Sequence, residues 1–274
     1  MTVSNTAKRV WVSVFTIPLI LAASYFGNLF FFMFVLMIAL VSFYEYGALV
    51  KNKGAEVNLL LGYLAIIFLL TNQYNSFFDT YSFILLLIVL LTGIELFRNK
   101  NSAIYNTGST LLGIFYIGLF SSSLIGLREF YHKADNVYNQ GGLLIIALFL
   151  TIWVCDSAAF FGGTALGKHK LFPRVSPNKS WEGAFLGFIF AIVAMILSKV
   201  IFLDFLDWTS AIALGIIIGA IGQIGDLIES LIKRDAGVKD SSNLIPGHGG
   251  IFDRFDSVLY TAPVVLLYLK YFGR

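Results

Sequence analysis

The chain has 274 residues, of which 58% are hydrophobic and 13% charged, and its mean hydropathy is +0.81. Soluble domains carry about 25% charged residues, so this composition excludes an ordinary water-soluble fold. The formal net charge of +3 is too small to indicate nucleic-acid binding, and the single cysteine, Cys155, excludes an intramolecular disulfide. Because Cys155 lies in an apolar run, we interpret it as a small buried hydrophobic residue.

Apolar stretches of membrane-spanning length recur along the chain. A spanning helix needs about 20 mostly apolar residues, and nine stretches approach this length. We therefore predict an all-α, polytopic integral membrane protein with about nine transmembrane helices. The spans lie near 10–27, 29–50, 57–73, 77–97, 104–127, 142–165, 183–203, 209–232 and 255–272. The first resembles a secretory signal, but the many later spans favour an uncleaved helix. The polar stretch 72–76 predicts a tight hairpin between the third and fourth.

The distribution of Lys and Arg predicts the orientation of these spans. With nine spans and a cytoplasmic N-terminus, 14 basic residues fall inside and 5 outside, as the positive-inside rule requires. Loops 166–182 and 233–254 are then cytoplasmic, where nucleoside triphosphates are available. Within one continuous membrane domain, we expect 1–140 to be scaffold helices and 141–274 to carry the chemistry.

The eighth predicted span carries small and acidic residues on one face. Gly215, Gly219, Gly222, Asp226 and Glu229 follow helical spacing. Close helix packing explains the first two glycines. It does not explain Asp226, because a lone carboxylate at membrane depth costs several kcal/mol. We therefore predict a functional role for Asp226, and leave structural and functional roles open for Glu229.

The densest charge in the chain follows, in residues 230–256 (the signature segment). Asp253 and Asp256 flank Arg254 at the start of the ninth span, and helix capping would need only one of these carboxylates. Together with Asp226 they could supply oxygen ligands to one or two hard cations. The Gly247–Gly250 run, beside Lys239, is either an ordinary turn or a nest of backbone N–H groups for an anion, and the neighbouring charges favour the anion. His248 has no suitably spaced partner for zinc.

Three further groups lie in span six and in the loop that follows it. Asp156 interrupts an apolar span, so the membrane-charge argument applies to it as well. Residues 162–168 nearly match a P-loop, but His169 replaces the expected Ser/Thr and no strand precedes the run, so we reject that interpretation. The run 176–183 predicts a turn into a capped helix, which accounts for Ser180 and Glu182 but not for Lys179, a candidate phosphate contact.

The signature segment resembles that of the phosphatidate cytidylyltransferases, also called CDP-diacylglycerol synthases. The resemblance lies in Ser230, Lys233, Arg234, Lys239, Asp240, Ser242, Ile245, Pro246, His248, Gly249, Gly250, Asp253, Arg254 and Asp256. Asp156-Ser157 and the 176–183 run also resemble family elements, whereas the N-terminal spans match in hydrophobicity alone.

The resemblance implies that CTP and phosphatidate react to give CDP-diacylglycerol and pyrophosphate in phospholipid biosynthesis, with Mg²⁺ held by Asp226 and Asp253. It further implies a homodimer and a second cation, K⁺ or Mg²⁺. We expect a multi-pass protein of the cell (inner) membrane that contacts membrane lipids and has its active site facing the cytoplasm. The expected catalytic residues are Asp226, Asp253, Asp256 and Lys239. The expected substrate-binding residues are Asp156, Lys179, Ser180, Glu182, Lys233, Arg234, Asp240, His248, Gly249, Gly250 and Arg254.

Two alternatives remain open at this point. A CTP-dependent polyprenol or phytol kinase would use a similar nucleotide site but transfer the γ-phosphoryl group. A lipid or ion transporter would line a pathway with Asp156, Asp226 and Glu229, although such sites usually lie at the bilayer midplane between repeated halves. The charges here cluster at one face, and no internal repeat is evident.

Overall fold

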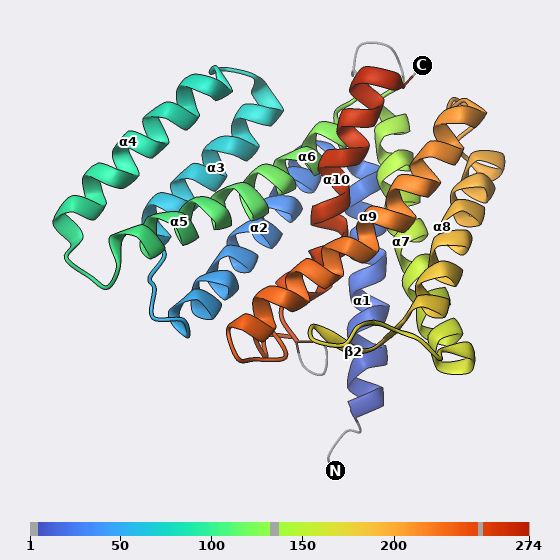
Figure 1. Cartoon of the computed structure of the whole chain (residues 1–274). Helices are drawn as coiled ribbons and strands as arrows, with labels where there is room; N and C mark the ends of the chain where they lie inside the picture. Colours follow the sequence, from blue (N-terminus) through green and yellow to red (C-terminus); the bar gives the residue numbers. More distant parts are fainter. Residues whose placement is uncertain (1–4, 132–136, 246–248, 274) are drawn as a thin grey trace. The chain divides into compact units, whose positions relative to one another are not determined.

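The structure is a computed structural model that describes residues 5–131, 137–245 and 249–273, with the backbone alone for 5–11. Helices dominate these residues (Figure 1). The elements in chain order are α1 (Asn5–Phe26), α2 (Asn28–Lys51), α3 (Leu59–Asn75), α4 (Thr80–Arg98), α5 (Ala103–Gly113), the π-helical η1 (Ile114–Leu119), α6 (Phe120–Arg128), α7 (Tyr138–Leu166), β1 (Lys170–Phe172), β2 (Ser176–Ser180), α8 (Trp181–Ile201), α9 (Trp208–Asp235) and α10 (Phe252–Phe272).

The chain is an all-α integral membrane protein, as predicted. Each of the nine predicted ranges falls on a helix, and α5, η1 and α6 together cover the fifth. Among the described residues, six helical stretches are long and apolar enough to cross a bilayer. These are Asn28–Lys51, Thr80–Arg98, Ala103–Arg128, Tyr138–Leu166, Trp181–Ile201 and Trp208–Asp235. Val12–Phe26 and Leu59–Asn75 are shorter apolar helices. The total of nine spans and the cytoplasmic N-terminus therefore stay predictions.

The chain forms two compact units, each assembled from separate stretches. Unit 1 comprises Met1–Ile17, Asn28–Gly126 and Ile232–Phe255, and unit 2 comprises Pro18–Gly27, Leu127–Leu231 and Asp256–Arg274. Unit 1 thus combines early helices with most of the signature segment. The predicted functional division near residue 140 stays a prediction.

The core of unit 1 is built by α2, α3 and η1. Phe43, Ile66, Ile114 and Ile117 are fully buried. A Cβ atom added at Gly113 would lie 2.7 Å from the rings of both Phe43 and Tyr46. The backbone of α5 therefore passes so close to α2 that only glycine fits at this position.

The predicted hairpin between α3 and α4 is present. The chain reverses between Asn75 and Thr80. The side chain of Asn72 closes the turn by accepting from the N–H of Phe78 and donating to its carbonyl, at 2.9 and 3.0 Å. Ser76 takes the left-handed conformation that ends α3, and the ring of Phe68 stacks on that of Phe83.

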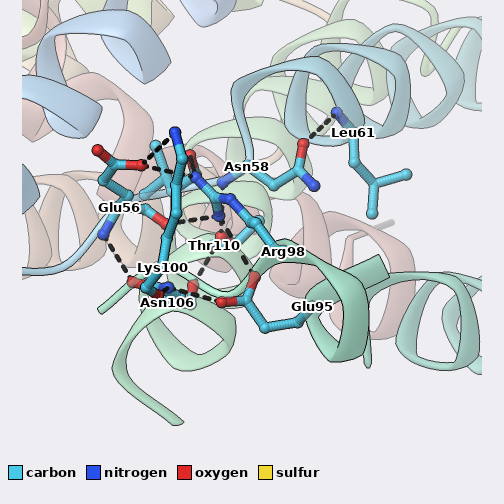
Figure 2. Close-up of polar contacts among 9 residues, drawn as sticks. Glu56, Asn58, Leu61, Glu95, Arg98, Lys100, Asn106 and Thr110 are labelled. Carbon is cyan, nitrogen blue, oxygen red and sulfur yellow. Dashed lines mark hydrogen bonds and ion pairs between the residues drawn. The ribbon is translucent and has the colours of Figure 1, made fainter. Parts of the chain in front are cut away.

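A polar network in unit 1 fixes the loop after α2 to the ends of α4 and α5 (Figure 2). Arg98 binds the Glu56 and Glu95 carboxylates at 3.2 and 3.3 Å. Asn106 donates to Glu95 at 2.6 Å and accepts from the Glu56 N–H at 2.7 Å. Lys100 adds an ion pair to Glu56 at 3.4 Å. Glu95 is thus a buried carboxylate whose partners hold the scaffold together.

In unit 2, α7 and α8 lie side by side (Figure 1) and pack through small residues. A Cβ atom at Gly187 would lie 2.9 Å from both the Ala159 Cβ and the Cys155 carbonyl oxygen. Cys155 itself is buried, which confirms its interpretation as a small core residue. The missing side chain at Gly187 therefore allows close backbone contact between α7 and α8.

The first glycines of α9 serve the same purpose, as predicted. A Cβ atom at Gly215 would lie 2.8 Å from the Cα of Ile192, and one at Gly219 would lie 2.9 Å from the Cβ of Ala191. Both neighbours belong to α8. Gly215 and Gly219 therefore allow α9 to approach α8 closely.

Arg128 is the largest fully buried side chain of the described structure. It donates to the carbonyl oxygens of Ser24, Tyr25 and Tyr138 at 2.7 to 3.0 Å, and its guanidinium lies over the Tyr138 ring. Arg128 thereby satisfies carbonyls at the C-terminal end of α1, which have no partners within that helix.

Candidate active site

The predicted site residues fall into two groups, one in each compact unit. The group in unit 1 surrounds Asp253 and the described residues of the connection between α9 and α10, 236–245 and 249–251, hereafter the α9–α10 loop. The group in unit 2 surrounds Asp226. Each group is a set of polar side chains at the ends of apolar helices.

Asp253, in the first turn of α10, organises the α9–α10 loop. Its Oδ1 accepts from Lys233 Nζ at 2.6 Å. Its Oδ2 lies within bonding distance of the Ser241 N–H, the Ser241 hydroxyl and the Gly250 N–H, at 2.9, 2.9 and 2.7 Å. Both side chains of the Lys233–Asp253 pair are almost fully buried. The carboxylate thus connects Ser241 and Gly250 of the loop with the last turn of α9.

Two glycines of the loop, Gly249 and Gly250, are required by close contacts. Gly249 has φ +82°, and a Cβ atom there would lie 2.7 Å from Asp253 Oδ2. The Gly249 carbonyl accepts from the Ile245 N–H at 2.9 Å. The Gly250 N–H already donates to Asp253, so this donor of the predicted nest is used within the loop. His248 lies outside the described residues, and the anion-binding role of the glycine run stays a prediction.

Glu45 of α2, which was not predicted from the sequence, is the second buried carboxylate at this loop. It accepts hydrogen bonds from Ser241 Oγ at 3.0 Å, Ser242 Oγ at 2.5 Å, Ile251 N at 3.1 Å and Phe252 N at 2.8 Å. Its side chain is 2% exposed. A signal was available, because Glu45 interrupts an apolar span as Asp156 and Asp226 do.

In unit 2, Asp226 pairs with Lys179. The Lys179 ammonium forms an ion pair and hydrogen bond with Asp226 Oδ2, while Ser230, one turn along α9, donates to Oδ1 at 3.3 Å. The two charged side chains remain 30% and 32% exposed. The structure therefore brings together the candidate metal ligand and the candidate phosphate contact, and leaves both accessible.

The strand that carries Lys179 belongs to a β-hairpin that was not predicted. β1 and β2 pair antiparallel, with Lys170 opposite Ser180. Ser180 then caps α8 by accepting from the Gly183 N–H at 3.2 Å, as predicted. Glu182 accepts from the N–H groups of Lys168 and His169 and contacts His169 Nδ1 at 2.6 Å. In these contacts Glu182 anchors the chain that enters the hairpin.

The remaining predicted residues lie on α7, α9, α10 and the α9–α10 loop. Arg234 is exposed and donates to the Val238 carbonyl at 3.0 Å, closing the end of α9. Asp256 is half-buried and accepts from the Ser257 N–H at 2.6 Å. Four further predicted residues are exposed: Asp156 on α7, Lys239 and Asp240 in the α9–α10 loop, and Arg254 on α10.

Mg²⁺ is the cation that the resemblance implies for this site. Within the described ranges, no three His, Cys, Asp or Glu side chains gather to form a metal site. Mg²⁺ usually takes only one or two carboxylates and completes its shell with water and substrate phosphates, so a three-ligand cage is not required. Asp226 fits this pattern because its side chain is 32% exposed, and Mg²⁺ would take the place of the Lys179 ammonium on its carboxylate. Asp253 is occupied by Lys233 and backbone donors, so its role as a ligand requires an exchange of partners.

Comparison with known proteins decides the family. The model of the cytidylyltransferase family matches residues 7–272. The chain is 34% identical to the phosphatidate cytidylyltransferase of Bacillus subtilis (strain 168), over 90% of its own length and 91% of the relative's. It is 33% identical to the protein of the same name from Staphylococcus aureus (strain COL), over 89% and 91%. The chain belongs to the cytidylyltransferase family.

Family membership extends the resemblance beyond the signature segment. From sequence motifs alone, the N-terminal spans matched in hydrophobicity only, whereas the cytidylyltransferase family model covers α2 as well. Glu45 of α2, which binds the α9–α10 loop, therefore lies inside the matched region. The N-terminal half of this cytidylyltransferase contributes directly to the geometry of the signature segment.

Proposed function

We propose that the chain catalyses the reaction of CTP with phosphatidate to give CDP-diacylglycerol and pyrophosphate, in phospholipid biosynthesis. The observation that carries the proposal is its identity, over about nine-tenths of the chain, with relatives named phosphatidate cytidylyltransferase. The structure supports it by ordering the signature segment around buried carboxylates while Lys239, Asp240 and Arg254 stay exposed.

The reaction needs little proton transfer from the protein. A phosphate monoester has a second pKa of about 6, so an oxygen of phosphatidate is already ionised at neutral pH. That oxygen attacks the α-phosphorus of CTP and forms the new P–O bond. The bond from the α-phosphorus to the bridging oxygen breaks, and pyrophosphate leaves with that electron pair. The barrier therefore arises chiefly from repulsion between anions and from charge on the leaving group.

Charged side chains and a bound metal ion would counter this repulsion. Asp226 and Asp253 would hold Mg²⁺, as the resemblance implies, with Asp256 in or beside the same shell. The metal would neutralise charge on the CTP phosphates. Lys239, Arg254 and the His248–Gly250 run would bind the triphosphate and stabilise departing pyrophosphate. Lys179 and Ser180 would bind the phosphatidate headgroup, and Asp156 would border the site.

The remaining assignments belong to the same proposal. We infer a multi-pass protein of the cell (inner) membrane that acts at the cytoplasmic face, as a homodimer, with a second cation, K⁺ or Mg²⁺. Contacts within unit 1 support the sidedness. Lys53, just beyond α2, pairs with Asp235 at the end of α9 at 3.3 Å, so these two helix ends lie on one side, as the predicted topology requires.

Product analysis with differently labelled CTP tests the function. The purified protein, in lipid–detergent micelles containing phosphatidate, should incorporate label from cytosine or the α-phosphate into lipid and release pyrophosphate, and should require Mg²⁺. Label from the γ-phosphate should stay out of the lipid. Transfer of γ-label instead would identify a lipid kinase, and no transfer of either label would contradict the proposal.

A further inference from the structure

Glu45 stands out among the buried carboxylates of unit 1, because every contact described above joins it to residues about 200 positions away in the sequence. It lies in α2, yet its partners are Ser241, Ser242, Ile251 and Phe252. The carboxylate therefore links a scaffold helix to the middle of the α9–α10 loop and to the start of α10.

Two of these bonds complete the start of α10. The first N–H groups of a helix have no partners within it, and a negative charge there is favourable. Ile251 and Phe252 supply such groups, and Glu45 accepts from both, at 3.1 and 2.8 Å. A side chain from a distant helix thus does what a local cap residue usually does, and fixes where α10 begins relative to α2.

The other bonds connect Glu45 to Asp253. The Ser241 hydroxyl lies 3.0 Å from Glu45 Oε2 and 2.9 Å from Asp253 Oδ2, so its single hydrogen can be donated to either carboxylate. A Cβ atom at Gly250 would overlap the Ser241 hydroxyl and the Glu45 carboxylate, whose Oε1 would lie 2.6 Å away. Ser241, Gly250 and the carboxylates of Glu45 and Asp253 therefore pack directly against one another. A substitution at Glu45 should for this reason also shift Asp253.

The contacts exclude a direct chemical role in this arrangement. Glu45 is 2% exposed, and both of its oxygens already accept hydrogen bonds. It is therefore unsuited to take a proton from substrate or to reach a phosphate-bound cation. The residues that it orders flank the exposed Lys239, Asp240 and Arg254.

We propose that Glu45 is a positioning residue that holds the α9–α10 loop in the conformation that binds the CTP phosphates. The inference rests on the proposed function. It assigns to the N-terminal scaffold a part in nucleotide binding that the signature segment alone does not reveal. Glu45 acts through Ser241, Ser242 and the start of α10, and touches no reacting atom.

The test compares Glu45→Gln with Glu95→Gln. Both replace a buried carboxylate of unit 1 by an amide, but the bonds of Glu95 go to Asn106 and Arg98, away from the loop. KM for CTP, KM for phosphatidate, kcat and thermal stability are measured for each variant. We expect Glu45→Gln to raise KM for CTP by about tenfold or more, as for loss of a residue that orients a ligand-binding group, with KM for phosphatidate changed less than about twofold.

A second variant covers the case in which Glu45→Gln does not fold. Ser242→Ala removes one hydroxyl that bonds Glu45 at 2.5 Å and should raise KM for CTP by a few fold. Glu95→Gln should leave both KM values near those of the wild type, whatever its effect on melting temperature. The proposal is overturned if Glu45→Gln or Ser242→Ala leaves KM for CTP unchanged, or if both KM values shift equally and in step with stability. An inactive wild-type protein would instead refute the proposed function.

Discussion

Lys233 Nζ lies 2.6 Å from Asp253 Oδ1, and the two side chains are 11% and 2% exposed. The pair joins the last turn of α9 to the first turn of α10. Charges this deeply buried are tolerated only when each has a partner and further hydrogen bonds, and Asp253 has both. The signature segment therefore combines exposed charges with a buried ion pair and hydrogen bonds that hold its backbone in place.

Breaking this pair should destabilise the protein. Lys233→Met leaves the Asp253 carboxylate buried without its cation, which costs about 3–5 kcal/mol. The matched control is Lys53→Met, because Lys53 pairs with Asp235 at 3.3 Å but both side chains are more than half exposed. An exposed pair contributes about 0–1 kcal/mol. Denaturant titration in detergent measures the free energy of unfolding of both variants. Equal losses for the two substitutions would contradict a stabilising role for the buried Lys233–Asp253 pair.

Replacing Lys179 should weaken the binding of phosphatidate more than the binding of CTP. Its ammonium lies on the Asp226 carboxylate in unit 2 and is 30% exposed, so a phosphate can compete for it. A hydrogen bond to a charged group contributes about 1.5–3 kcal/mol. Lys179→Met should therefore raise KM for phosphatidate by about tenfold or more, with a much smaller change in KM for CTP.

The control for Lys179 is Lys170→Met in the same hairpin. Lys170 is exposed on β1, and its side chain makes none of the hydrogen bonds or ion pairs described above. Steady-state kinetics with each substrate varied in turn should give near wild-type values for this variant. A Lys179→Met enzyme with unchanged KM for phosphatidate would remove that residue from the headgroup site.

The seam between α7 and α8 should not accept a larger residue. Gly187→Ala places a methyl group 2.9 Å from both the Ala159 Cβ and the Cys155 carbonyl, and overpacking of this kind costs about 1–3 kcal/mol. Gly93→Ala in α4 is the control, since no atom outside its own helix lies within 4 Å of the added carbon. Thermal unfolding should separate the two, and equal melting temperatures would contradict the close packing described for α7 and α8.

Much of this architecture follows from the sequence. Hydrophobic runs are a sufficient signal for a helix in a membrane, and all nine predicted ranges are helical. Local polar signals were also sufficient for the Asn72–Ser76 turn and for the Ser180 cap. In these cases the residues that determine the structure are neighbours in the chain.

The features that were missed depend on contacts between distant segments. Strands β1 and β2 are three and five residues long, and β2 contains Pro177. They therefore lack the alternation of apolar and polar residues from which a strand is predicted. The partners of Glu45 lie 196–207 residues away, and one sequence contains no information on such pairing. The division of the predicted acidic residues between Lys179–Asp226 and Lys233–Asp253 pairs was equally inaccessible.

The central claim is that Asp226 holds a divalent cation against the CTP phosphates. Electron paramagnetic resonance with Mn²⁺ in place of Mg²⁺, recorded with CTP present, measures this binding directly. Asp226→Asn should weaken Mn²⁺ binding by at least about 10–100-fold and abolish turnover without lowering the melting temperature by more than a few degrees. Asp235→Asn, an exposed carboxylate at the end of the same helix, should bind as the wild type does. Wild-type Mn²⁺ affinity and turnover in Asp226→Asn would show that Asp226 does not hold the cation.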